Sequence, residues 1–168
     1  MFKLIVLTTL VLFTLAREKP YNEWISARMA NLSTAIYKVN KEGQPENQCI
    51  LCYQDFQLKS VVESLTLMAM IGYDKTLKSV VVVFRGSDNT ANWVLSDFLA
   101  LHSLYPKMFS CFGCHVHLGF RNSYAILVRK GLKKQVKAAL DEHPGCGIIY
   151  TGHSLGGALA NYAVVRFS

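Results

Sequence analysis

The sequence predicts an α/β fold with a largely parallel sheet, and three features of the chain support this prediction. Residues 80–84 are β-branched or aromatic without alternation, which is typical of a strand covered on both faces. An amphipathic pattern predicts a helix over 121–140, and the short apolar segment 148–150 predicts the strand that follows it. That strand leads into a glycine-flanked serine and then into small residues that begin another helix. The order strand, helix, strand, helix indicates a sheet with helices packed on its faces.

The remaining elements follow in chain order. Apolar residues recur every three or four positions over 22–39, which predicts an amphipathic helix. Residues 41–49 are rich in Gly, Pro, Gln and Asn, so we expect a loop there. Two apolar runs, 64–73 and 79–84, flank a turn-like segment and are expected to pair as strands. A further short strand is expected at 115–118, before the long helix.

The N-terminus has the pattern of a secretory signal peptide over residues 1–16. Lys3 supplies a positive charge, residues 4–15 are apolar, and Ala16 ends the segment with a small side chain. The apolar run is shorter than the about 20 residues that span a bilayer, so cleavage is favoured over a membrane anchor. We therefore expect a secreted protein, extracellular or in the secretory or lysosomal lumen, with one domain over 17–168.

Secretion changes the interpretation of the five cysteines, because an oxidising compartment favours disulfides. Cys49 and Cys52 form one pair, and Cys111 and Cys114 form another. The two pairs lie much farther apart than the roughly 15 to 20 residues of four-cysteine zinc patterns. Disulfides of unresolved connectivity are therefore favoured over zinc, and we expect no metal. The fifth, Cys146, is either a buried thiol or pairs with a cysteine outside this sequence.

The chain carries a formal net charge of +7, and part of it falls on the predicted helix 121–140. A solvated helix face is the favoured interpretation, and attraction to an anionic lipid surface is the alternative. No motif or aromatic platform points to nucleic acid, so no nucleic-acid partner is expected. The basic residues of this face are Arg129, Lys130, Lys133, Lys134 and Lys137.

The most specific chemical signal lies where the predicted strand 148–150 ends. Ser154 stands between Gly152 and Gly156, at the spacing that a sharp strand-to-helix turn requires. In such a nucleophile elbow the serine is exposed at the tip of the turn. The backbone N–H of Leu155 then points into the same space and can hold an oxyanion at a helix N-terminus. Ser154 is therefore the candidate nucleophile.

A second oxyanion donor should come from the loop after an earlier central strand. The loop that follows the predicted strand 80–84 is Arg85-Gly86-Ser87. Ser87 offers both a backbone N–H and a hydroxyl, and Gly86 allows close approach of the backbone. Ser87 is therefore the candidate second donor.

Three blocks of sequence, taken in order, resemble the class 3, or fungal-type, lipase family of α/β-hydrolases. They cover most of the predicted mature chain, and together they are much more specific than the elbow alone. The blocks are residues 84–87 with Asn92, Trp93 and Asp97 downstream, residues 116–120, and residues 151–160.

This resemblance implies an α/β-hydrolase fold in which Ser154 is the acyl-accepting nucleophile and Ser87 and Leu155 are the oxyanion donors. It implies that the segment 89–93 is a lid over the acyl site, with Trp93 as the residue that reaches lipid or covers the groove. It also implies hydrolysis of glycerolipid esters at an interface, with transient contact with a lipid surface and no cofactor. Packing of Trp93 on the body of the domain is the alternative.

The chain departs from the family pattern in one respect. In α/β-hydrolases the acid and the histidine follow the nucleophile, but no Asp, Glu or His follows Ser154 here. The fold is therefore expected to be truncated after the elbow and its helix, with an open apolar sheet edge. Among the histidines present, His153 is expected to pack or hydrogen-bond beneath the turn, and His117 to have a structural role at a strand end.

The favoured function is that of a secreted serine hydrolase that cleaves carboxylic ester bonds of lipids, as a triacylglycerol lipase does. The alternative is a fragment that binds lipid or a partner without catalysis, because the triad acid and histidine are absent. A glycosylation sequon begins at Asn31 within the predicted helix, where use is less favoured than in a loop. The sequence leaves open the headgroup, the acyl chain length and the oligomeric state.

Overall fold

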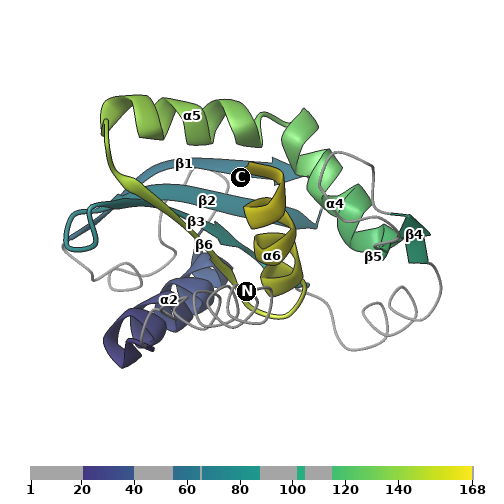
Figure 1. Ribbon diagram of the computed structural model, residues 1–168, viewed down its shortest axis with the longest axis horizontal. Helices are drawn as coiled ribbons and strands as arrows, with labels where there is room; N and C mark the ends of the chain where they lie inside the picture. The colour runs from purple at the N-terminus through teal and green to yellow at the C-terminus, as the bar shows by residue number, and fades with distance from the viewer. Residues whose placement is uncertain (1–20, 40–54, 65, 88–101, 105–114, 168) are drawn as a thin grey trace, which may run out of the picture.

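A computed structural model describes residues 21–39, 55–64, 66–87, 102–104 and 115–167 (Figure 1). The first helix begins after Asn22, whose side-chain oxygen accepts a hydrogen bond from the N–H of Ile25 at 3.0 Å. The elements, in chain order, are α2 (Glu23–Ala35), η1 (Ile36–Lys38), β1 (Phe56–Ser64), β2 (Leu67–Asp74), β3 (Ser79–Phe84), β4 (His102–Leu104), β5 (His115–His117), α4 (Leu118–Arg129), α5 (Leu132–Glu142), β6 (Gly147–Gly152) and α6 (Leu155–Phe167).

The central sheet has four strands in the order β1-β2-β3-β6. Strands β1, β2 and β3 are joined as antiparallel neighbours, whereas β6 lies parallel to β3. The chain between β3 and β6 carries α4 and α5 across one face of this sheet (Figure 1). Strands β4 and β5 form a separate antiparallel pair. The chain is therefore an α/β fold, as predicted, although the sheet is mixed rather than largely parallel.

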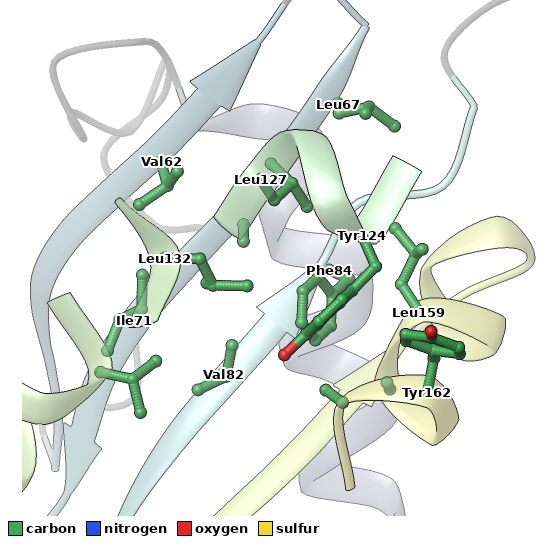
Figure 2. Packing of buried hydrophobic residues seen from close by; sticks show 14 of the residues in the cluster. Val62, Leu67, Ile71, Val82, Phe84, Tyr124, Leu127, Leu132, Leu159 and Tyr162 are labelled. Atoms are coloured by element: carbon green, nitrogen blue, oxygen red, sulfur yellow. The ribbon is translucent and has the colours of Figure 1, made fainter. Parts of the chain in front are cut away.

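Helices cover both faces of the sheet, and β3 is buried on both sides. Helices α4, α5 and α6 lie over one face, and α2 lies under the other (Figure 1). Val82 and Phe84 of β3 face the first group, while Val81 and Val83 pack with Leu32 and the rest of α2. Figure 2 shows the first of these cores, where side chains of α4, α5 and α6 close over the sheet. The prediction of a strand covered on both faces is confirmed.

Three secondary-structure predictions need correction. The helix predicted over 121–140 is two helices, because Gly131 adopts φ 103 and turns the chain between α4 and α5. Apolar periodicity continues across this break, which is why the pattern suggested one helix. Strand β1 was not predicted, since a bulge between Leu58 and Ser60 interrupts its alternation. The strand predicted over 64–73 begins later, at Leu67, because residue 64 already ends β1.

A buried ion pair between Arg28 and Asp74 links α2 to the end of β2. The Nε of Arg28 donates to Oδ2 of Asp74 at 2.5 Å, and the two side chains are 6% and 0% exposed. Oδ1 of Asp74 accepts a second hydrogen bond from the N–H of Leu77 at 3.0 Å. The guanidinium of Arg28 also lies 5.5 Å from the ring centroid of Trp24. Helix α2 is therefore held to the sheet by charge as well as by apolar contact.

Beyond β6 the sheet is open within the described part of the chain. Strand β6 pairs with β3 on one side, and Ile148 on it is 36% exposed. Val164 and Val165, near the end of α6, are 49% and 41% exposed. Among the described strands, β6 therefore forms one edge of the sheet, with exposed apolar side chains on it and on α6.

The basic residues of the predicted solvated face are all exposed, namely Arg129, Lys130, Lys133, Lys134 and Lys137. Lys137 donates to both carboxylate oxygens of Asp141, at 2.8 and 2.7 Å, so part of this charge is neutralised locally. Among the described residues, no helix is long and apolar enough to cross a membrane.

Several predicted features lie outside the described residues. These are the signal peptide 1–16, the lid candidate Trp93 with its segment 89–93, and the disulfide candidates Cys49, Cys52, Cys111 and Cys114. Cys146 is described, is partly buried and forms no disulfide.

Candidate active site

The nucleophile candidate stands on a strained turn between β6 and α6. Ser154 has φ 55, a left-handed conformation that costs a non-glycine residue about 1 kcal/mol or more. Its side chain is exposed, and α6 begins with the next residue, Leu155. The backbone therefore presents the hydroxyl at the tip of the turn, which is the geometry that the sequence predicts for an elbow.

The glycines on either side of Ser154 let this turn pack against the end of β3. A Cβ on Gly152 would lie 2.7 Å from the carbonyl oxygen of Phe84. A Cβ on Gly156 would lie 2.8 Å from the carbonyl carbon of Phe84 and would collide with its oxygen. Because these neighbours are backbone atoms, they cannot move aside as a flexible side chain could. Glycine is therefore required at both positions for steric reasons.

The loop after β3 lies directly against the elbow. A Cβ on Gly86 would be 2.7 Å from the carbonyl oxygen of His153 and 3.4 Å from Cβ of Ser154. The loop is anchored on its other side, because the N–H of Arg85 donates to the carbonyl of Met68 at 2.9 Å. Ser87 follows Gly86 directly and is half-buried. The structure thus brings the loop that carries Ser87 to the nucleophile.

Backbone donors gather at the N-terminus of α6. The N–H groups of Gly156 and Gly157 donate to the carbonyls of His153 and Ser154, each at 2.9 Å. The N–H of Leu155 precedes them, in the first turn, where a helix offers donors without intrahelical partners. The positive end of the helix dipole lies at the same place, so this corner of the site favours a developing negative charge.

Three of the described histidines have partners other than the nucleophile. The Nδ1 of His153 lies 3.2 Å from the hydroxyl of Tyr37, so the expected hydrogen bond is present, but His153 is exposed and does not lie buried beneath the turn. His117 ends β5, and its Nδ1 accepts from the N–H of Gly119 at 3.1 Å, which caps α4. His143 stacks on Tyr73 with ring centroids 3.6 Å apart. None of these three contacts involves the Ser154 hydroxyl.

Tyr37 and Ser33 are site residues that the sequence interpretation missed. Tyr37 contacts His153 over 116 positions of sequence, and Ser33 contacts Thr151 over 118. Contacts of this range leave no local pattern, and both residues lie on what resembles an ordinary amphipathic helix. Ser33 also belongs to the sequon that begins at Asn31, and its side chain is buried.

One ionisable group on the strand behind the elbow is strongly perturbed. Burial raises the pKa of Tyr150 well above its usual range, and the nearby Tyr124 adds to the shift. Tyr150 therefore stays neutral, and its side chain packs against the core. Across the described residues, no group of three or more His, Cys, Asp or Glu side chains is arranged to hold a metal ion.

An exposed serine at a strained strand-to-helix turn, faced by the loop after a central parallel strand, has the geometry of the nucleophile elbow found in the α/β-hydrolase class. Residues 81–167 match the family model described as "Lipase (class 3)". This match covers more than half of the chain, which therefore belongs to the class 3 lipase family, as the sequence resemblance predicts.

Individual proteins agree with this assignment. A "Secreted mono- and diacylglycerol lipase A" of Penicillium cyclopium is 35% identical over 109 residues, covering 65% of this chain and 33% of that protein. A "Lipase" of Rhizomucor miehei is 34% identical over 116 residues, covering 67% of this chain and 31% of that protein. The chain thus spans about a third of the length of these relatives.

Solved structures show the same fold. The triacylglyceride lipase of Rhizomucor miehei superposes with a TM-score of 0.68 at 25% identity, over 89% of this chain and 57% of that chain. The Lip2 lipase of Yarrowia lipolytica gives a TM-score of 0.72 at 19% identity, over 90% of this chain and 58% of that chain. The chain therefore has the α/β-hydrolase fold over most of its length and corresponds to part of each lipase.

Proposed function

We propose that this protein is a secreted serine hydrolase that cleaves carboxylic ester bonds of lipids. The observation that carries the proposal is the exposed Ser154 at φ 55, with the Gly86 loop packed against it. Relatives named as mono- and diacylglycerol lipases and as a triacylglyceride lipase support glycerolipid esters as the substrate class. The signal-like residues 1–16 and the word "Secreted" in the name of the Penicillium relative support secretion.

In the proposed reaction, Oγ of Ser154 attacks the ester carbonyl as its proton is taken by a base. The carbonyl oxygen becomes an oxyanion, which accepts hydrogen bonds from the N–H of Leu155 and from the N–H or hydroxyl of Ser87. These donors stand at the N-terminus of α6, where the helix dipole adds to their effect. The alcohol leaves with a proton, and water then releases the fatty acid from Ser154.

The base required by this scheme is a histidine held by an acid. No Asp, Glu or His follows Ser154 among the 168 residues, and the scheme gives residue numbers to neither of these two groups. In serine triads, loss of the base costs several powers of ten in rate, and oxyanion binding retains a residual acceleration. The rate of ester hydrolysis is therefore expected to depend strongly on this base.

Trp93 and the segment 89–93 are proposed to form a lid that opens at a lipid surface. An exposed tryptophan in such a segment can insert into lipid, because its ring is apolar while its N–H remains hydrogen-bonded to water at the interface. This role would give the enzyme a preference for aggregated over dissolved substrate.

The test is hydrolysis by the natural protein, at the length that its transcript encodes, of triacylglycerol, phospholipid and short soluble esters. Wild type is expected to hydrolyse at least the acylglycerol, and Ser154→Ala is expected to abolish that activity without unfolding the protein. Hydrolysis that persists in Ser154→Ala would defeat the proposal. The ranking of the three substrates separates lipase from phospholipase A1 and from carboxylesterase.

A second candidate is a non-catalytic protein that binds lipid or a partner surface. The observation that favours it is that His117, His143 and His153 have contacts with residues other than Ser154. A transcript that ends after residue 168 and a folded, secreted product without esterase activity would support this candidate. A transcript that continues and encodes an aspartate and a histidine would support the enzyme.

A further inference from the structure

The N-terminal helix touches the strand that leads into the elbow at two points. Oγ of Ser33 lies 3.0 Å from Oγ1 of Thr151. The hydroxyl of Tyr37 lies 3.2 Å from Nδ1 of His153. Because the Ser33 hydroxyl already donates to the carbonyl of Met29 at 2.8 Å, the hydroxyl of Thr151 is the donor in the first of these contacts.

The two contacts involve neighbouring residues on both segments. Ser33 lies on α2, and Tyr37 lies on η1, four residues further along. Thr151 lies on β6, and His153 is the first residue after that strand ends at Gly152. The two hydrogen bonds therefore hold both the end of β6 and the start of the elbow against the N-terminal helical segment.

The hydroxyl of Tyr37 also reaches the loop on the other side of the nucleophile. A Cβ on Gly86 would collide with this hydroxyl and would lie 3.4 Å from Cβ of Ser154. The ring of Tyr37 meets the imidazole of His153 edge to face, with centroids 6.2 Å apart and planes at 65°. One oxygen atom therefore lies where the loop that carries Ser87 meets the elbow.

We propose that Tyr37 is a positioning residue for ester hydrolysis. Its hydroxyl holds His153, and thereby the backbone of Ser154, at a fixed distance from the loop of Ser87, while Ser33 fixes the strand behind it. Tyr37 does not react with the substrate. It sets the distance between the nucleophile Ser154 and the oxyanion donors. A displacement of about 1 Å between such groups can lower the rate about 100-fold. This inference rests on the proposed function.

The variant that tests it is Tyr37→Phe, which removes one oxygen and keeps the ring. The matched control is Tyr73→Phe, because Tyr73 is also half-buried and packed against a histidine ring, but far from the elbow in the fold. A second test variant is Ser33→Ala, which removes the other contact. All are made in the natural protein, at the length that its transcript encodes.

The readouts separate positioning from folding. Hydrolysis of a short soluble ester is measured, and kcat is expressed per active serine, as titrated with a fluorophosphonate. We expect Tyr37→Phe to lower this kcat about 5- to 10-fold and to leave KM within twofold of the wild-type value. A trifluoromethyl ketone, which resembles the tetrahedral intermediate, should bind more weakly by a similar factor, and the corresponding plain ketone should not. Ser33→Ala should lower kcat less. Thermal midpoints of Tyr37→Phe and Tyr73→Phe should agree within about 2 °C.

Three results would overturn the inference. Tyr37→Phe could keep the wild-type kcat per titrated serine, Tyr73→Phe could lose as much, or the plain ketone could weaken as much as the trifluoromethyl ketone. In each of these cases wild type still hydrolyses esters, so the proposed function stands. A folded wild type that neither hydrolyses esters nor reacts with the fluorophosphonate would overturn the proposed function, and the role of Tyr37 with it.

Discussion

Replacing Asp74 by asparagine should destabilise the fold far more than any change at a surface ion pair. Asp74 is 0% exposed and Arg28 is 6% exposed, so the guanidinium would lose its buried counter-charge without gaining water. Removing one partner of such a pair costs about 3 to 5 kcal/mol. We expect about 3 kcal/mol for Asp74→Asn, because the amide oxygen can still accept the hydrogen bond from Leu77.

The assay is urea unfolding at pH 7, followed by tryptophan fluorescence. With a urea dependence of about 1.5 kcal/mol per molar, a loss of about 3 kcal/mol lowers the midpoint by about 2 M. The control is Asp141→Asn, which breaks the exposed pair with Lys137, where the side chains are 61% and 74% exposed. An exposed pair is worth at most about 1 kcal/mol, and we expect a midpoint shift below about 0.5 M. Equal midpoints for the two variants would refute the reasoning.

The fold and the site give three further predictions. Ser154→Gly should raise the free energy of unfolding by about 1 kcal/mol while abolishing hydrolysis, because glycine accepts φ 55 without strain. The control Lys78→Gly, at φ 47, should stabilise the protein by a similar amount and leave hydrolysis intact. A Ser154→Gly protein that is less stable than wild type would contradict the backbone strain assigned to Ser154. Gly86→Ala should lower kcat at least about 10-fold, because its Cβ would meet backbone of the elbow, and wild-type kcat would argue against that contact. The hydrogen bond from Lys59, followed by its charge, lowers the pKa of Glu142 from 4.5. The stability that ionised Glu142 contributes is present above pH 4.5 and is lost as the pH falls through its lowered pKa. Glu142→Gln should therefore make the free energy of unfolding less dependent on pH in the acid range. An unchanged pH dependence would contradict the pairing of Glu142 with Lys59.

Local signals made part of the fold predictable. The β-branched run of β3 and the glycines around Ser154 are confined to a few residues, so they could be recognised without knowledge of distant contacts. The close packing against the backbone of Phe84 is the physical reason for those glycines. These features predicted both the buried strand and the elbow.

Other features could not be predicted, because they depend on one residue or on distant contacts. A single glycine at 131 divides the predicted helix, while the apolar periodicity on either side continues unbroken. The bulge after Leu58 shifts the alternation of β1 and hides that strand. The contacts of Ser33 and Tyr37 with the elbow strand join segments more than 100 residues apart, and no local pattern encodes them.

Adduct mapping tests the central claim most directly. The natural protein is treated with a fluorophosphonate, digested, and examined by mass spectrometry, with Ser154→Ala treated in parallel. We predict one phosphonylated residue, Ser154, in wild type and none in the variant, with loss of esterase activity in proportion to labelling. A folded wild type without an adduct on Ser154, or with its adduct on another residue, would contradict the claim that this elbow carries the nucleophile.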